Sequence, residues 1–176
     1  MTRDLSAALP ELPVPDGVEV VGFTAERSQD ARLVRNESFR DHWGSTETTA
    51  EGWANSLSSR AFRPALSFLA DAGQEPLGIV LGHEYDAHTE TTGQRDLYIP
   101  VVGTRRAGRG RGIAAALLAR ALAEARGPDS PPPRWASDAD SPTGAVGLYQ
   151  RLAFTVKDTW ITQLKPLLVA ARADPR

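Results

Sequence analysis

One segment, residues 101–127, constrains the fold more than any other, because three different patterns follow one another in it. It reads VVGTRRAGRGRGIAAALLARALAEARG: an apolar strand end, a cluster of arginines and glycines, and a helical pattern of apolar residues. The first amides of a helix have no intrahelical partner, and the helix dipole adds partial positive charge there. Glycines beside such a helix let an anion approach the backbone closely, because they carry no Cβ. The segment therefore predicts a strand–loop–helix junction that binds a phosphate group.

Two common nucleotide-binding patterns do not fit this loop. A Walker A sequence requires Gly-Lys-Ser/Thr, which is missing here. The dinucleotide-binding fingerprint requires G-x-G-x-x-G, whereas Gly108, Gly110 and Gly112 alternate. An arginine-rich solvated loop or a contact to nucleic acid would produce a similar sequence, so these readings of the loop stay open beside the phosphate site.

Composition limits the class of protein. The chain has 176 residues, of which 41% are hydrophobic and 24% charged, enough for one well-buried core. A formal net charge of −2 argues against a surface built as a whole for nucleic acid or for an anionic membrane, and we expect neither partner. The absence of cysteine excludes disulfides, thiolate nucleophiles and cysteine-ligated metal sites, and we predict no metal site. No apolar run reaches the roughly 18 residues of a membrane span, so we expect a soluble cytoplasmic protein.

The patterns predict one domain of class α+β, or mixed α/β, with a largely antiparallel sheet. We expect a flexible, proline-rich leader over residues 1–16, the domain over 17–167 and a tail over 168–176. The predicted elements are a strand at 17–23, a helix at 26–43, a short helix capped by Thr48 or Thr49, two strands around a turn within 65–85, a polar turn at 89–94, a strand at 96–103, a helix at 112–126, a short strand at 134–140, a helix at 141–153 and a strand at 154–164. Pro100 cannot donate to a strand ladder, so its strand must lie at an edge, bulge or splay there.

Two motifs resemble those of the GNAT superfamily of N-acetyltransferases. Arg109, Gly112 and Ala114 match R-x-x-G-x-A, which resembles that family's pyrophosphate-binding signature, Q/R-x-x-G-x-G/A. Downstream, SPTGAVGLYQRLAF resembles its second signature, of the type N-P-x-x-A-x-x-L-Y-x-x-x-G-F. The order of elements over the domain is also similar to the family's, and the segment after residue 96 is similar to actinobacterial members related to mycothiol synthase domains.

The resemblance implies a cofactor, a reaction and a set of site residues. It implies acetyl-CoA as cofactor and transfer of the acetyl group to a primary amine of a small molecule or protein. It implies a twisted, mostly antiparallel sheet flanked by helices, with two strands splaying near Pro100 to form a cofactor cleft. Tyr149 would be the general acid that protonates the departing CoA thiolate. Main-chain groups would bind the pantetheine arm at Val102 and Thr104, and the pyrophosphate at Arg109, Gly110, Arg111, Gly112, Ile113 and Ala114.

The sequence departs from the family pattern and leaves alternatives. Ser141 stands where asparagine is usual, Ala153 replaces a glycine, and GPDSPPPRWAS replaces the apolar strand expected before the second motif. A non-catalytic acyl-CoA-binding or sensor module of the same fold is therefore a second hypothesis. A small nucleic-acid-binding protein is a third, and it would use the four arginines Arg105, Arg106, Arg109 and Arg111.

No motif identifies the general base or the acceptor amine. Asp41, His42, His83 and Glu84 are the polar groups that could accept the amine's proton, and each would equally suit a solvated surface. The sequence FRDHWG, together with Trp53, would form either an aromatic lid over the acceptor or a packed core pair. A homodimer is compatible with the sequence.

Overall fold

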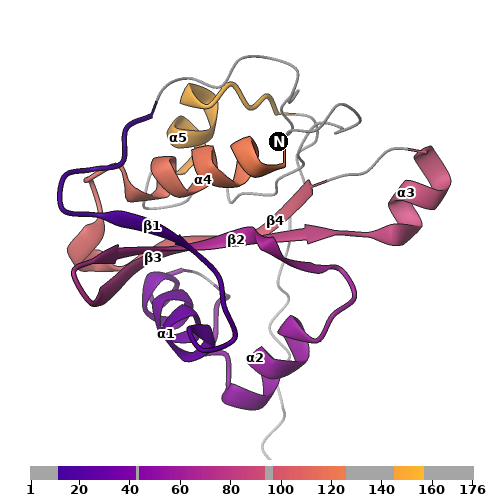
Figure 1. Cartoon of the computed structure of the whole chain (residues 1–176), viewed down its shortest axis with the longest axis horizontal. Helices are drawn as coiled ribbons and strands as arrows, with labels where there is room; N and C mark the ends of the chain where they lie inside the picture. The colour runs from indigo at the N-terminus through magenta and orange to yellow at the C-terminus, as the bar shows by residue number, and fades with distance from the viewer. Residues whose placement is uncertain (1–11, 43, 94–96, 126–144, 157–176) are drawn as a thin grey trace, which may run out of the picture.

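A computed structural model describes residues 12–42, 44–93, 97–125 and 145–156 of the chain. These residues form a four-stranded antiparallel sheet in the order β1-β2-β3-β4. Helices α1 and α2 cover one face, α4 and α5 cover the other, and α3 projects beyond the end of β3 (Figure 1). The mixed α+β class with an antiparallel sheet is therefore confirmed. The elements are β1 Glu19–Gly22, α1 Ser28–Ser38, α2 Ala50–Leu57, β2 Phe62–Ala72, β3 Glu75–Glu84, α3 Asp86–Thr92, β4 Leu97–Thr104, the 3₁₀ turn η1 Arg106–Gly108, α4 Ile113–Glu124 and α5 Ala145–Arg151.

The sheet separates two hydrophobic cores. Alternate residues of a strand point to opposite faces, and β3 is buried on both because helices cover both. The core beneath α4 and α5 includes Phe68, Val80, Ile99, Leu117, Leu118, Leu122, Tyr149 and Leu152. The core beneath α1 and α2 includes Val34, Trp53, Phe62, Leu69, Ile79 and Leu81.

Two glycines let helices approach the sheet closely from opposite sides. A Cβ on Gly78 of β3 would lie 2.6 Å from the Cγ2 of Ile113 in α4, and one on Gly103 of β4 would lie 2.8 Å from the Cβ of Ser38 in α1. Real Cβ atoms do not tolerate such short contacts. The start of α4 and the end of α1 can therefore approach the sheet this closely only because these two positions are glycines. The end of β4 is therefore packed from both faces.

The predicted irregularity at Pro100 is confirmed as a bulge. Leu81 pairs with Val101 and His83 pairs with Tyr98, so the single residue between them on β3 faces two residues on β4. β4 is also the edge strand of the sheet formed by the described residues. The predicted cap of the second helix is confirmed as well, because the Thr49 hydroxyl accepts a hydrogen bond from the Gly52 amide at 3.1 Å.

Two boundaries predicted from the sequence are wrong. The first helix ends at Ser38 rather than near residue 43, because the following amides bond three residues back, as from His42 to Phe39 at 3.0 Å. The polar turn predicted at 89–94 is largely helix α3. The hydroxyls of Thr91 and Thr92 donate to carbonyls four residues earlier, and a left-handed Gly93 ends the helix, so residues typical of turns fit a helical turn here.

Trp53 is a core residue and not part of a lid. It is 3% exposed, and its Nε1 donates to the Ser28 hydroxyl at 3.1 Å. Trp43, the expected strand at 134–140 and all but the start of the expected strand at 154–164 lie outside the described residues. Of the helices that the structure describes, none is long and apolar enough to cross a membrane.

Candidate functional site

The loop between β4 and α4, with the first residues of the helix, forms a structure we call the cradle, residues 105–114. η1 makes one turn, and the chain then passes through Gly110 at φ 76° and Gly112 at φ 90° before α4 begins at Ile113. Positive φ angles strain residues that carry a Cβ, so both positions favour glycine. The alternating glycines thus serve a left-handed path into the helix.

The cradle presents a run of backbone amides at the N-terminus of α4. The first hydrogen bond into the helix runs from the Ala116 amide to the Gly112 carbonyl at 3.0 Å. The preceding amides, from Gly110 to Ala115, have no acceptor within the described part of the chain. Such amides and the helix dipole together favour an anion. The amide of Arg109 differs, because it donates to the Arg106 carbonyl at 3.3 Å.

Two cradle arginines form ion pairs with the end of α1. The Nε of Arg105 lies 2.6 Å from an oxygen of Glu37, and a terminal nitrogen of Arg106 lies 2.7 Å from an oxygen of Asp41. The hydrogen bond and charge of Arg106 lower the pKa of Asp41, so this carboxylate stays ionised. Asp41, one of the predicted candidates for the general base, is therefore a partner of the cradle.

The other two cradle arginines contact only carbonyl oxygens at hydrogen-bond distance. The Nε of Arg109 donates to the Thr104 carbonyl at 3.3 Å, and its Nη2 donates to the Ser38 carbonyl at 3.0 Å. Arg111 is exposed, and its Nη2 lies 3.4 Å from the carbonyl of Asp16. The guanidiniums of Arg105, Arg106 and Arg109 thus contact groups of α1 or of the residues that follow it, and only that of Arg111 does not.

The backbone of β4 leaves alternate polar groups directed away from β3. The Arg105 amide donates to the Leu77 carbonyl at 2.8 Å, which shows which residues of β4 form hydrogen bonds with β3. In an antiparallel pair the bonding direction alternates along the strand, so Val102 and Thr104 direct their main-chain groups toward the outer edge. These are the two residues predicted to pair with pantetheine.

At the other end of β4, five aromatic rings form a continuous row. The rings belong, in order of contact, to Phe23, Phe62, His83, Tyr85 and Tyr98, with centroids 5.3, 5.8, 6.2 and 5.8 Å apart. His83 is central to the row and lies directly opposite Tyr98, next to the bulge. The sequence singled out only His83 of these five residues, because period-two apolar patterns do not show which rings meet across strands.

His83 carries a neutral ring. Burial first, and the positive charge of Arg63 second, lower its pKa from the usual value near 6.5. Its Nδ1 is buried and has no hydrogen-bond partner among the described residues. A protonated ring would place a second donor in this unpartnered position, which opposes protonation further.

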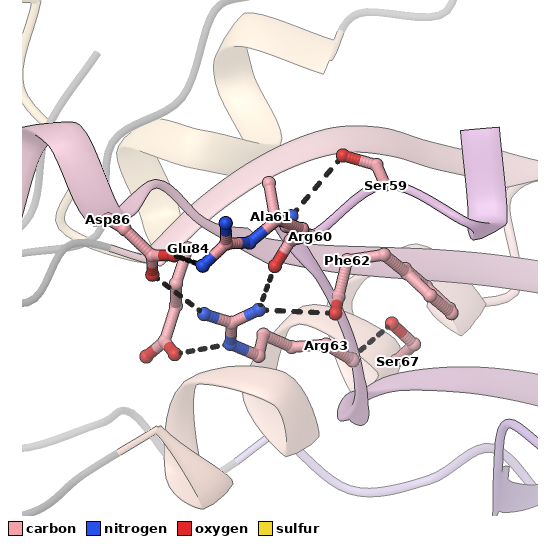
Figure 2. Close-up of polar contacts among 8 residues, drawn as sticks. All are labelled: Ser59, Arg60, Ala61, Phe62, Arg63, Ser67, Glu84 and Asp86. Atoms are coloured by element: carbon pink, nitrogen blue, oxygen red, sulfur yellow. Dashed lines mark hydrogen bonds and ion pairs between the residues drawn. The ribbon is translucent and has the colours of Figure 1, made fainter. Parts of the chain in front are cut away.

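The Arg63 guanidinium, whose charge acts on His83, engages the neighbouring candidate Glu84 (Figure 2). Its Nε lies 2.8 Å from an oxygen of Glu84, and a terminal nitrogen lies 3.4 Å from Asp86. The Ser67 hydroxyl donates to the Arg63 carbonyl at 2.8 Å and accepts from the Gly82 amide at 3.0 Å. These contacts hold an irregular segment of β2 between Arg63 and Phe68, whose pairing partners on β3 are only two positions apart.

The four candidate bases do not lie together. Asp41 and His42 follow α1 at the cradle, whereas His83 and Glu84 lie at the opposite end of β3. His83 lies six positions after Leu77, which contacts the cradle, so the two ends are about 20 Å apart along the strand.

Tyr149 lies in α5, on the face of the sheet that α4 covers. It is 2% exposed, and its ring meets the edge of Phe154 with centroids 6.0 Å apart. It belongs to the large core cluster beneath α4 and α5, which also contains Leu97 and Ile99 of β4. Its ring is therefore buried and held by packing.

Comparisons with known proteins show which family the chain resembles in sequence and fold. The chain matches the family model described as "Acetyltransferase (GNAT) family" over residues 29–154. It is 31% identical over 159 residues to a mycothiol acetyltransferase of Salinispora tropica, covering 88% of this chain and 50% of that protein. The chain spans about half the length of the curated relatives it matches.

Solved structures show the same fold. A GCN5-related N-acetyltransferase from Sphaerobacter thermophilus is 28% identical, with a TM-score of 0.68 over 89% of this chain and 47% of that one. Arabidopsis thaliana Naa50, solved in complex with the bisubstrate analogue CoA-Ac-MVNAL, has a TM-score of 0.61 at 15% identity, over 81% of this chain and 85% of that one. The second likeness concerns the fold alone.

Proposed function

Because the chain belongs to the acetyltransferase (GNAT) family, we propose that it transfers the acetyl group of acetyl-CoA to a primary amine of a small molecule or a protein. The observation that carries the proposal is the run of amides from Gly110 to Ala115, which has no acceptor among the described residues and lies at a helix N-terminus. A pyrophosphate would satisfy these amides and the helix dipole together. No side chain intrudes at Gly110, where a Cβ would have no atom within 4 Å.

The residues of β4 suit the rest of the cofactor. Acetyl-CoA supplies the acetyl group as a thioester on a long pantetheine arm. Val102 would bind that arm through its outward amide and carbonyl, and Thr104 through its outward amide, because the Thr104 carbonyl accepts from Arg109. If the phosphates lie at the cradle, the pantetheine arm would run from there along β4 toward the bulge at Ile99 and Pro100.

Two side chains would handle protons. Tyr149, buried in the core beneath α4 and α5, would donate a proton to the departing thiolate. His83, on the other face, is neutral near pH 7 and would accept a proton from the amine directly or through water. Asp41 lies at the cradle end and is paired with Arg106, so we propose no proton transfer there.

Turnover with a panel of amines tests the proposal. Purified protein is mixed with acetyl-CoA and an amine, and release of the CoA thiol is followed over time. The panel contains an amino sugar, a polyamine, a lysine peptide and the amine precursor of mycothiol, the last because curated relatives are named mycothiol acetyltransferases. Saturable thiol release with at least one amine is the expected result.

Binding of acetyl-CoA, measured separately by calorimetry, separates the alternatives. Tight binding with no turnover on any amine would favour the non-catalytic acyl-CoA-binding module. An absence of binding at millimolar acetyl-CoA would overturn both functions.

A further inference from the structure

The Arg109 guanidinium is engaged by main-chain oxygens of the protein itself. Its two hydrogen bonds reach the carbonyls of Ser38 and Thr104, residues that lie 71 and five positions away in sequence. The nearest carboxylate in an ion pair with it, that of Asp41, is 3.8 Å away. Arg109 therefore contacts main-chain oxygens in preference to the acid beside it.

Both acceptors lie at the ends of elements that support the cradle. Ser38 is the last residue of α1, where carbonyls lack helical partners and the helix dipole favours a cation. Thr104 is the last residue of β4, with its carbonyl directed away from β3. One guanidinium thus joins the end of α1 to the end of β4 at the point where Gly103 and Ser38 make their close contact.

Arg111 is held by fewer and longer contacts than Arg109. It is exposed, it lies between the two left-handed glycines, and it forms no ion pair with any carboxylate in the described segments. Its one hydrogen bond, to the Asp16 carbonyl, is long at 3.4 Å. Moving this side chain toward an anion at the cradle would cost little.

We propose that two cradle arginines have different roles. Arg109 positions the cradle through the Ser38 and Thr104 carbonyls, and Arg111 supplies the side-chain charge that binds the phosphates. The inference rests on the proposed function, because the phosphates are those of acetyl-CoA. It assigns to Arg109, the arginine of the R-x-x-G-x-A motif, a contact with the protein and not with the ligand.

Conservative variants distinguish a positioning role of Arg109 from a role as a charge that binds the ligand. Arg109→Lys keeps the positive charge but cannot donate two diverging planar hydrogen bonds. Arg109→Gln loses the charge and the planar pair of donors. We expect both to weaken acetyl-CoA binding by about tenfold or more, to similar extents, and to leave its dependence on salt unchanged. Arg111→Lys should bind nearly as the parent does, whereas Arg111→Gln should bind more weakly and with a smaller salt dependence, because salt screens the lost charge pair.

Hydrogen exchange without cofactor gives a second readout. The segment 105–116 and the end of α1 should exchange faster in both Arg109 variants than in the parent, and at the parent's rate in Arg111→Gln. If the Arg109 variants fail to fold while Arg111→Gln folds, the structural role is supported, because a residue that only binds ligand is not needed for folding.

Two results would overturn the division of roles. Parent-like affinity and exchange in Arg109→Lys, with loss of affinity only in Arg109→Gln, would make Arg109 a charge ligand. Parent-like affinity and salt dependence in Arg111→Gln would remove the role of Arg111. If the parent itself binds no acetyl-CoA, the proposed function fails, while the exchange measurements still decide whether Arg109 braces the cradle.

Discussion

Gly112 directs the first amides of α4, because its φ of 90° turns the chain into the helix. Gly112→Ala should cost about 1–2 kcal/mol of folding free energy through left-handed strain. If relaxation of that strain turns the amides away, acetyl-CoA affinity should fall as well. Gly73→Ala is the matched control: Gly73 also has a positive φ, of 65°, but lies in the β2–β3 turn. The control should lose stability, by urea unfolding, and keep its affinity; equal affinities in both variants would contradict a phosphate site at Gly112.

Tyr149 has a buried ring, so removing only its hydroxyl tests chemistry apart from packing. In Tyr149→Phe the edge contact with Phe154 is preserved, and acetyl-CoA affinity should change little. Turnover should fall by about a hundredfold or less, because positioned proton transfer contributes roughly that much at its low end. The alkaline limb of the pH–rate profile should weaken with it. Identical profiles in parent and variant would leave Tyr149 as a packing residue.

His83 makes stability depend on pH. Its folded pKa lies below its unfolded value near 6.5, so the unfolded chain binds more protons as the pH falls. The contribution of the neutral ring is complete above pH 6.5 and is lost as the pH drops toward the folded pKa. The parent should therefore lose more unfolding free energy between pH 7.5 and 5.5 than His83→Gln does, as measured by urea denaturation. An equal response in the parent and in His83→Gln would refute the assignment.

Among the elements, β2 depends on one buried hydroxyl. Ser67 is fully buried and joins the Arg63 carbonyl to the Gly82 amide across the irregular segment of β2. Ser67→Ala leaves both groups without that partner and should destabilise the fold by about 1–3 kcal/mol. Ser56→Ala, whose exposed hydroxyl in α2 contacts a carbonyl four residues earlier, should change stability by much less. Unfolding curves of the two variants that coincide would show that this segment of β2 does not depend on Ser67.

Elements with local signals could be predicted, and contacts between distant segments could not. The cap at Thr49, the β2–β3 turn and the bulge at Pro100 follow from chemistry within a few residues. The close approach of Ser38 at the end of α1 to Gly103 could not be predicted, because the two residues are some 65 positions apart in sequence. For the same reason the amides of the cradle were predictable and the partners of Arg109 were not. The row of rings around His83 depends on the registers of β2, β3 and β4 together.

For the whole molecule, binding of acetyl-CoA should increase the free energy of unfolding and so raise the melting temperature. A ligand that binds only the folded state adds RT ln(1 + [L]/Kd), about 2.7 kcal/mol at a hundredfold excess over Kd. For a chain of this size that corresponds to a rise in melting temperature of about 5–10 °C. Acetyl-CoA should produce this rise in a thermal unfolding scan, and adenosine, which lacks the pyrophosphate, should not. A flat response to acetyl-CoA would count against the cradle as its site.

The ties from Arg105, Arg106 and Arg109 to the end of α1 also bear on the kinetics of binding. A loop that is held at several points before its ligand arrives loses little conformational entropy on binding, and needs no slow rearrangement first. A cofactor that binds there would meet a preorganised site, so its association rate would be set by diffusion and charge steering. Differences in affinity between variants with an intact loop would then appear mainly in how long the complex lasts.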